Sequence, residues 1–270
     1  YVSRVVFSQH DPQVMYASFD NHKMGDFKPY ALRSNDLGKS WTSIAGDLPV
    51  RGTVYVLVED PGKQELLFAG TEFGLFFTPD AGKRWVQLKG GVPTIQIRDL
   101  AIQKRENDLI AASFGRGFYV LDDYTALRSI NDATLAKDAV LFPVKKAQTY
   151  TLSSPFGGTD QGSSGDQFYV APNPPLGAVF TYYLKKELKT REKTRQEADK
   201  ELAKKDADTH YPTWDELRGE EREEAPAVVL TVTDVDGNVV RRVYGGIKAG
   251  LQRTTWDLRY PPAVPTELTK

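Results

Sequence analysis

The sequence predicts an all-β protein with two parts: a partial β-propeller of three blades, followed by a β-sandwich that carries a charged helical insertion. The first observation is an octapeptide of the form Ser/Thr-x-Asp-x-Gly-Lys-x-Trp, which occurs at 34–41 and again, 44 positions later, at 78–85. The second is a longer repeat, in which 54–80 aligns without a gap with 97–123. Repeats of about 40–50 residues built from short strands are typical of propeller blades.

Each repeat is expected to contain four strands. Residues 54–88 include the runs VYVLV, ELLFAG, LFFT and WVQL, which are separated by turn-forming residues. An earlier copy covers 5–43 and carries five additional residues in the segment 20–29. A third copy keeps three strands, but no Gly-Lys-x-Trp follows them, so the series ends near Tyr124. We therefore expect residues 1–128 to form three blades.

The octapeptide lies between the third and fourth strands of a blade, where the chain needs a tight turn. A carboxylate there accepts hydrogen bonds from backbone N–H groups of its own turn, glycine supplies a positive φ, and tryptophan packs between blades. Two equivalent turns of neighbouring blades lie too far apart for a catalytic carboxylate pair, so we expect a structural role. The residues with this predicted role are Ser34, Asp36, Gly38, Trp41, Thr78, Asp80, Gly82 and Trp85.

The motif resembles the Asp-box of bacterial sialidases, xyloglucanase-type glycosidases, photosystem assembly propellers and sortilin-type receptors. The wider strings around both boxes, and ASFGRGFYVLDD at 112–123, are similar to those of bacterial sortilin-like proteins with Asp-box (BNR) repeats. Many of these proteins are named glycosyl hydrolases without a demonstrated reaction. The resemblance implies an exported bacterial protein in the periplasm, on the cell surface or secreted. The box takes no part in the chemistry of these families, so it does not imply an enzyme.

The sequence pattern of the second half of the chain predicts a β-sandwich interrupted by two helices. Alternating apolar runs and a DVDGN hairpin turn make 129–184 and 226–265 resemble an immunoglobulin-like β-sandwich. The segment between them, 185–225, is rich in charged helix formers, with a first helix expected over 185–208. Thr213, with a Glu three residues later, has capping-box spacing for a second helix. We expect an exposed helical insertion, and a docking arm for a protein partner is the functional alternative.

Blade geometry predicts where a site would lie. In a four-stranded antiparallel blade, the turn between the second and third strands lies on the face opposite the octapeptide turns, and ligand-facing residues are expected there. Ligand-binding candidates are His22, Glu72, Arg98 and Arg116. A glycosidase needs two carboxylates across a cleft, and the catalytic candidates are Glu72 with Asp20 or Asp26. The three arginines and the Tyr/Glu pair of a sialidase cannot be assigned.

Composition excludes several classes of function. The chain has no cysteine, which excludes disulfides, thiolate metal sites and thiol nucleophiles. The formal net charge is -1, so no global field favours nucleic acid. The sequence contains no apolar run of 18 residues, so no membrane span is predicted. The sequence contains no phosphate-binding loop, dinucleotide fingerprint or zinc-protease motif, and its histidines are far apart, so neither a cofactor nor a metal is expected.

Two functions from different classes remain open. The favoured one is an exported, non-catalytic binding or assembly module that recognises a protein or glycan through the face opposite the boxes. The alternative is a glycoside hydrolase with its active site in the channel of the complete propeller. Complete propellers have about four to eight blades, so the remaining blades are expected to come from the same gene product or from another chain.

Overall fold

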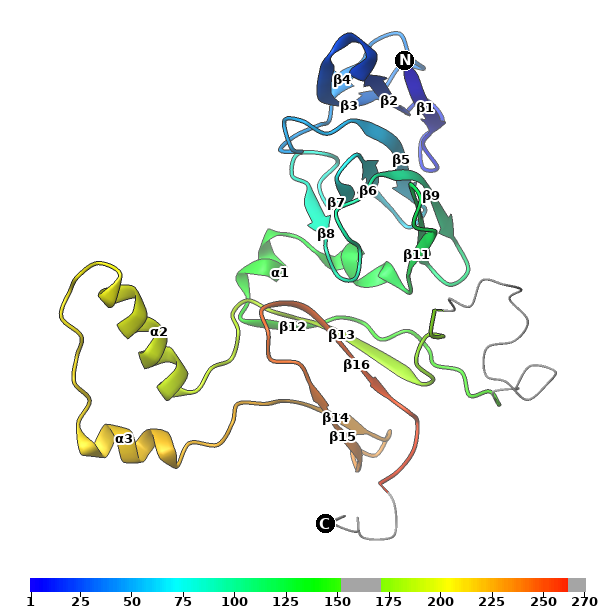
Figure 1. Ribbon diagram of the computed structural model, residues 1–270. Helices are drawn as coiled ribbons and strands as arrows, with labels where there is room; N and C mark the ends of the chain where they lie inside the picture. Colours follow the sequence, from blue (N-terminus) through cyan, green and yellow to red (C-terminus); the bar gives the residue numbers. More distant parts are fainter. Residues whose placement is uncertain (152–170, 262–270) are drawn as a thin grey trace. The chain divides into compact units, whose positions relative to one another are not determined.

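The computed structural model describes residues 1–151 and 171–261 of the chain, and it confirms the all-β prediction (Figure 1). Antiparallel strands dominate both halves. The chain divides into two compact units, Tyr1–Thr134 and Leu135–Lys270. We describe each unit by itself.

The first two sheets of the N-terminal unit each contain four strands paired in chain order, and we call them blades 1 and 2. Blade 1 consists of β1 (Val2–Phe7), β2 (Met15–Asn21), β3 (Asp26–Ser34) and β4 (Thr42–Ser43), with a 3-10 turn, η1 (His22–Met24), between β2 and β3. Blade 2 consists of β5 (Val54–Asp60), β6 (Lys63–Thr71), β7 (Gly74–Thr78) and β8 (Val86–Leu88).

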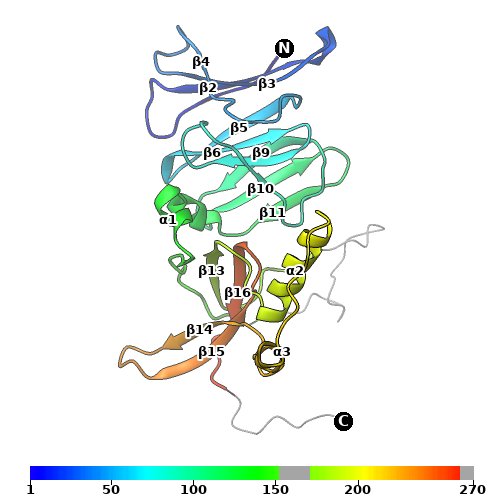
Figure 2. The same ribbon diagram turned by 90° about the vertical axis from the view of Figure 1, so that its left-hand side faces the viewer.

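The third sheet, blade 3, has three strands in the order β11-β10-β9. They are β9 (Ile97–Gln103), β10 (Asp108–Ser113) and β11 (Phe118–Leu121). In blades 1 and 2 an octapeptide turn and a fourth strand follow the third strand. In blade 3 the chain instead enters a 3-10 helix, η2 (Tyr124–Ser129), and a short helix, α1 (Asp132–Ala136). Figure 2 shows the three sheets layered one after another within this unit.

Blades 1 and 2 share one apolar core. Tyr16 and Ile44 of blade 1 pack with Leu57, Phe76 and Trp85 of blade 2, and all five side chains are buried. The repeat produces this core because alternate residues of a strand point to opposite faces, so the same apolar positions recur in each sheet. Burial of such side chains contributes roughly 1.5–3 kcal/mol each, which makes this interface a major source of stability.

The described strands of the C-terminal unit form two small sheets. One contains β12 (Ala139–Leu141), β13 (Ala178–Leu184) and β16 (Gly250–Trp256), and the other is a hairpin of β14 (Val228–Thr233) and β15 (Val239–Gly245). The Asp234 carboxylate closes the hairpin by accepting hydrogen bonds from the backbone N–H groups of Asp236 and Asn238, at 3.0 and 2.8 Å. The immunoglobulin-like arrangement stays a prediction, and residues 152–170 and 262–265 of its expected range lie outside the described residues.

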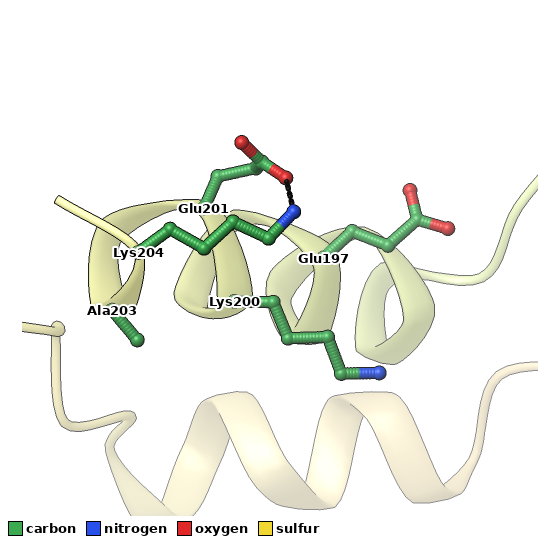
Figure 3. A pocket seen from close by; sticks show the side chains of 5 residues that line it. All are labelled: Glu197, Lys200, Glu201, Ala203 and Lys204. Carbon is green, nitrogen blue, oxygen red and sulfur yellow. Dashed lines mark hydrogen bonds and ion pairs between the residues drawn. The ribbon is translucent and has the colours of Figure 1, made fainter.

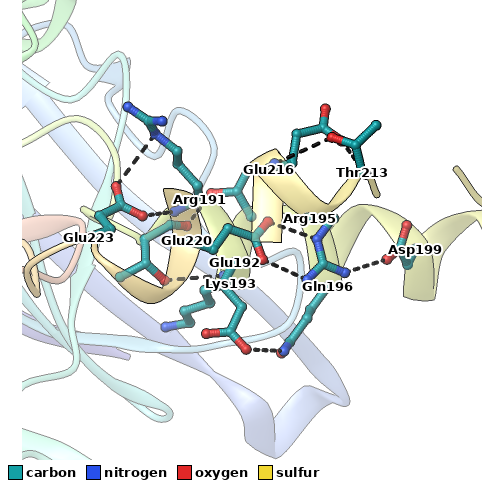
Figure 4. Close-up of polar contacts among 12 residues, drawn as sticks. Arg191, Glu192, Lys193, Arg195, Gln196, Asp199, Thr213, Glu216, Glu220 and Glu223 are labelled. Atoms are coloured by element: carbon teal, nitrogen blue, oxygen red, sulfur yellow. Dashed lines mark hydrogen bonds and ion pairs between the residues drawn. The ribbon is translucent and has the colours of Figure 1, made fainter. Parts of the chain in front are cut away.

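The charged insertion forms two helices, α2 (Arg191–Ala203) and α3 (Trp214–Glu221). The first is shorter than the expected 185–208, because the Thr190 hydroxyl caps its N-terminus. Thr213 forms the predicted capping box. The helices are joined by a bidentate ion pair in which Arg195 donates to both carboxylate oxygens of Glu220, at 2.8 and 2.7 Å (Figure 4).

Candidate functional site

Tyr55 is the centre of a polar cluster on the face opposite the octapeptide turns. The guanidinium carbon of Arg98, from β9, lies 4.0 Å from the centroid of the Tyr55 ring, from β5. Tyr55 is only 8% exposed, and its burial raises the pKa of its hydroxyl. The carboxylates of Glu72 and Asp20 act in the same direction, whereas Arg98 opposes them. Residues from all three blades therefore meet at this ring.

Asp20 lies at the end of β2 and is held by His22. One carboxylate oxygen of Asp20 accepts hydrogen bonds from the backbone N–H of His22, at 3.0 Å, and from the His22 ring. Burial opposes ionisation of Asp20, but these hydrogen bonds and the nearby charge of Arg98 lower its pKa below the ordinary value. Asp20 is thus a fixed anion beside Arg98, and the predicted candidates Asp20, His22, Glu72 and Arg98 come together around Tyr55.

Two other candidates do not join this cluster. Asp26 accepts hydrogen bonds from the Tyr30 hydroxyl, from the Lys28 backbone at 3.2 Å and from the Asn21 amide at 3.3 Å, and these contacts lower its pKa. Arg116 lies in the exposed turn between β10 and β11 and makes no hydrogen bond or ion pair with any residue in the described ranges. Asp26 therefore stabilises its own hairpin, and Arg116 stands apart.

The chemistry of the cluster suits binding through hydrogen bonds. A general acid of a glycosidase needs a raised pKa, but both aspartate candidates have lowered values and are held as anions. Glu72 is half-buried and is the remaining carboxylate candidate near the ring. Together the cluster offers one guanidinium and two carboxylates to a polar ligand, above a tyrosine ring that is itself buried.

The first octapeptide closes a turn through its aspartate. Asp36 accepts hydrogen bonds from the Ser34 hydroxyl at 2.7 Å, the Ser40 hydroxyl at 2.6 Å and the Ser40 backbone at 2.9 Å. The Ser40 and Ser34 contacts lower the pKa of Asp36 to about 2. Gly38 adopts a φ of 84° and donates its N–H to the Ser34 hydroxyl at 2.8 Å. The turn is therefore satisfied internally, as the sequence predicts for a structural element.

The second octapeptide repeats this network. Asp80 accepts from the Thr78 hydroxyl at 2.7 Å and from the backbones of Lys83 and Arg84 at 3.1 and 3.0 Å. Gly82 has a φ of 92° and donates to the Thr78 hydroxyl at 2.9 Å. The two tryptophans differ: Trp85 is buried against blade 1, whereas Trp41 is more than one third exposed. Neither octapeptide contributes to the cluster at Tyr55.

The prediction from sequence missed two buried acids that join blades. Glu59, at the end of β5, accepts hydrogen bonds from Ser8 and Tyr16 of blade 1. Asp60 is fully buried and receives two hydrogen bonds from Arg128, both at 2.8 Å, and one from the Tyr124 hydroxyl at 2.7 Å. The run VYVLVED contained the signal, because acids at the end of a buried strand need partners.

The helical insertion carries a shallow hollow that is separate from this cluster (Figure 3). All of its lining residues lie on or next to α2: Glu197, Lys200, Glu201, Ala203 and Lys204. Their alternating charges are those of a solvated helix face, so we assign the hollow no role. Within the described ranges, no three metal-ligating side chains gather at one point. None of the helices there has the length and apolarity needed to cross a bilayer.

No protein-family model and no curated protein matches this chain. Among solved structures, it is similar to an ancestral GH74 enzyme, with 24% identity, 43% of this chain and 14% of that chain covered, and a TM-score of 0.36. It is also similar to the GH74 xyloglucanase from Xanthomonas campestris (15% identity, 41% and 18% covered, TM-score 0.33) and to YCF48 bound to D1 peptide (20%, 46% and 37%, 0.33). Each match spans less than half of this chain and less than two thirds of the other.

Proposed function

We propose that this chain forms part of an exported, non-catalytic β-propeller module that binds a protein or a glycan at the cluster around Tyr55. The observation that carries the proposal is the stacking of Arg98 on Tyr55 beside the carboxylates of Asp20 and Glu72. This set holds a charged donor and two acceptors in fixed positions, which is typical of sites that orient polar ligands. Export rests on the resemblance to exported Asp-box proteins.

Exposed aromatic side chains extend this surface. Phe73, in the turn between β6 and β7, and Phe114, in the segment that leads from β10 to β11, lie on the same face and expose large parts of their rings. Aromatic rings bury a large apolar area at little cost in conformational entropy, which suits contact with a sugar ring or a peptide side chain. The face thus combines apolar platforms with the polar cluster.

The alternative is a glycoside hydrolase whose active site uses Glu72 in the channel of a complete propeller. It is favoured by the position of Glu72, which is half-buried and close to a second carboxylate, Asp20. The lowered pKa of Asp20 leaves that carboxylate only the role of base or nucleophile, so this alternative requires Glu72 to act as the general acid.

A binding screen on the full-length protein tests the proposal. The protein is applied to a glycan array and to a pull-down from a bacterial envelope extract, and each ligand found is titrated against the variants. Arg98→Ala should weaken binding at least about tenfold, since it removes a charged hydrogen-bond donor. Arg116→Ala, on the same face but outside the cluster, is the matched control and should bind normally. Equal affinities for both variants would remove the cluster from the proposal.

The enzyme alternative has its own readout. Release of reducing ends is measured on the glycans that bind, with the unmodified protein and with Glu72→Gln. Turnover by the unmodified protein that disappears in this variant would replace the binding proposal with the hydrolase.

The helical insertion is a second proposed contact surface for a protein partner. Tyr211, just before α3, is 90% exposed, and Trp214, the first residue of α3, is 78% exposed; solvent-exposed aromatics of this size are typical of interface anchors. A pull-down with and without residues 185–225 tests this surface separately from the cluster. Loss of a partner only on deletion assigns that partner to the insertion.

A further inference from the structure

One contact inside the chain shows how an octapeptide turn attaches to the neighbouring blade. The Trp85 indole donates a hydrogen bond to the carbonyl oxygen of Ile44 at 2.9 Å, and the Trp85 backbone donates to the Asp47 carboxylate at 2.6 Å. The turn also approaches the backbone of blade 1, because a Cβ added to Gly82 would lie 2.6 Å from the Ile44 oxygen. The octapeptide turn of blade 2, through Gly82 and Trp85, therefore docks on the segment 44–47 of blade 1, and we call this turn the docking turn.

Blade 1 carries the equivalent docking turn, the octapeptide at 34–41, but no other blade contacts it among the described residues. Trp41 is 37% exposed, and its indole turns back to donate to the carbonyl of Gly38 at 3.0 Å. The atoms nearest to a Cβ added at Gly38 would be side-chain atoms of Trp41, at 3.4 Å, and Met15, at 3.7 Å, both of blade 1. Blade 1 thus keeps a glycine with positive φ at position 38, although the atoms nearest to it are side-chain atoms and none is the backbone of another blade.

The surface of the blade 1 sheet beside this docking turn is apolar and exposed to solvent. Val6 packs on the core shared with blade 2, so its neighbours Val5 and Phe7 point to the opposite face of the sheet. Val5 is 46% exposed and Phe7 is 61% exposed. With Trp41, they form an apolar face on the side of blade 1 that points away from blade 2.

We infer that this face docks a further blade whose outermost strand is followed by an aliphatic residue and, three positions later, an aspartate. The aliphatic residue would supply the carbonyl that Ile44 gives to Trp85, and the aspartate would accept from the Trp41 backbone as Asp47 does from Trp85. On docking, the Trp41 indole exchanges its own-turn acceptor for the carbonyl of the partner blade. The internal copy of the contact provides both the geometry and the chemistry of the partner.

A second copy of this chain does not meet these requirements. Its unfilled segment after β8 begins at Leu88 and has Gly91 where blade 1 has Asp47. Glycine offers no carboxylate to the Trp41 backbone. The required occupant is therefore a blade with the aspartate, and self-association through this face is an outcome that the test can reveal.

A tandem chain tests the inference. A second copy of residues 1–50, with its own tryptophan changed to phenylalanine, is placed directly before Tyr1 of the full chain, so that its Ile-Ala-Gly-Asp segment can reach the Trp41 turn. Tethering gives the segment an effective concentration in the millimolar range. Hydrogen exchange of the Trp41 indole, followed by NMR, should slow at least about tenfold relative to the original chain, because the docked form excludes water.

Two variants make the result decisive. Changing the aspartate of the added copy to alanine should restore most of the exchange rate, and Gly38→Ala should do the same in the tandem chain while leaving the original chain folded. Equal exchange in the original and tandem chains, with both folded by circular dichroism, would overturn the inference. Slow exchange in the original chain that depends on protein concentration would replace the blade with a second copy as occupant.

Discussion

Removal of the Arg128 side chain should destabilise the N-terminal unit by about 3 kcal/mol. The Asp60 carboxylate is fully buried and would lose both hydrogen bonds from Arg128, keeping only those from the Tyr124 hydroxyl and the Gly62 backbone. Loss of one partner of a buried ion pair costs about 3–5 kcal/mol. We take the lower end because a quarter of the Arg128 side chain is exposed, so water can enter, and two donors remain.

Urea denaturation of the full chain, followed by far-ultraviolet circular dichroism and by the total fluorescence of its four tryptophans, measures this loss. Arg84→Ala is the matched control: the Arg84 side chain is half exposed and pairs with the exposed Asp132 and with Asp80 at the edge of its turn, so its loss should change the midpoint little. Adding Asp60→Asn to Arg128→Ala should recover part of the stability, because it removes the buried charge that the first change leaves unpaired. Equal midpoints for Arg128→Ala and Arg84→Ala would refute this reasoning.

Three further predictions concern the turns and the insertion. Gly82→Ala should destabilise the chain more than Gly38→Ala: both changes place a side chain at positive φ, at a cost of about 1–2 kcal/mol, but only the first also displaces the Ile44 backbone, and thermal melts compare them directly. The pKa of Asp36 is lowered from 3.8 to about 2, so its stabilising contribution is present above pH 4 and is lost as the pH falls towards 2; Asp36→Ala should flatten the stability profile in that window, and an unchanged slope would contradict the assignment. Thr213→Ala removes the capping box and should cost about 1 kcal/mol of helix stability, visible as a loss of helical circular dichroism on melting, whereas unchanged melting would show that α3 is held by its packing alone.

The parts of the fold that follow from local sequence were predictable. The strands of the blades come from alternating runs bounded by turn residues, and the hydrogen bonds of Asp36 and Asp80 stay within their own octapeptides. Thr213 was recognisable for the same reason, since a capping box spans only four residues. Each of these features depends on residues that are close neighbours in the chain.

The contacts between blades were not predictable in the same way. Tyr55 looks like one more apolar residue of a buried strand, and its meeting with Arg98 depends on how two sheets pack. The pairing of Asp60 with Arg128 joins residues 68 positions apart, and nothing local to either residue specifies it. Arg116 shows the converse, because its place in an equivalent turn did not bring it to the cluster.

The contact between Gly82 and blade 1 has a consequence for how such a protein changes in evolution. The octapeptide turn of a blade contacts only the blade that precedes it in the chain. A duplicated blade therefore carries both parts of the contact, the turn and the segment after its fourth strand, and can be added without changes in its neighbours. Blade 3 has no octapeptide, and the buried pair of Asp60 and Arg128 ties the segment after blade 3 to blade 2 instead. An array of this kind can gain units at one side, whereas the segment that contains Arg128 acts as a fixed terminus at the other.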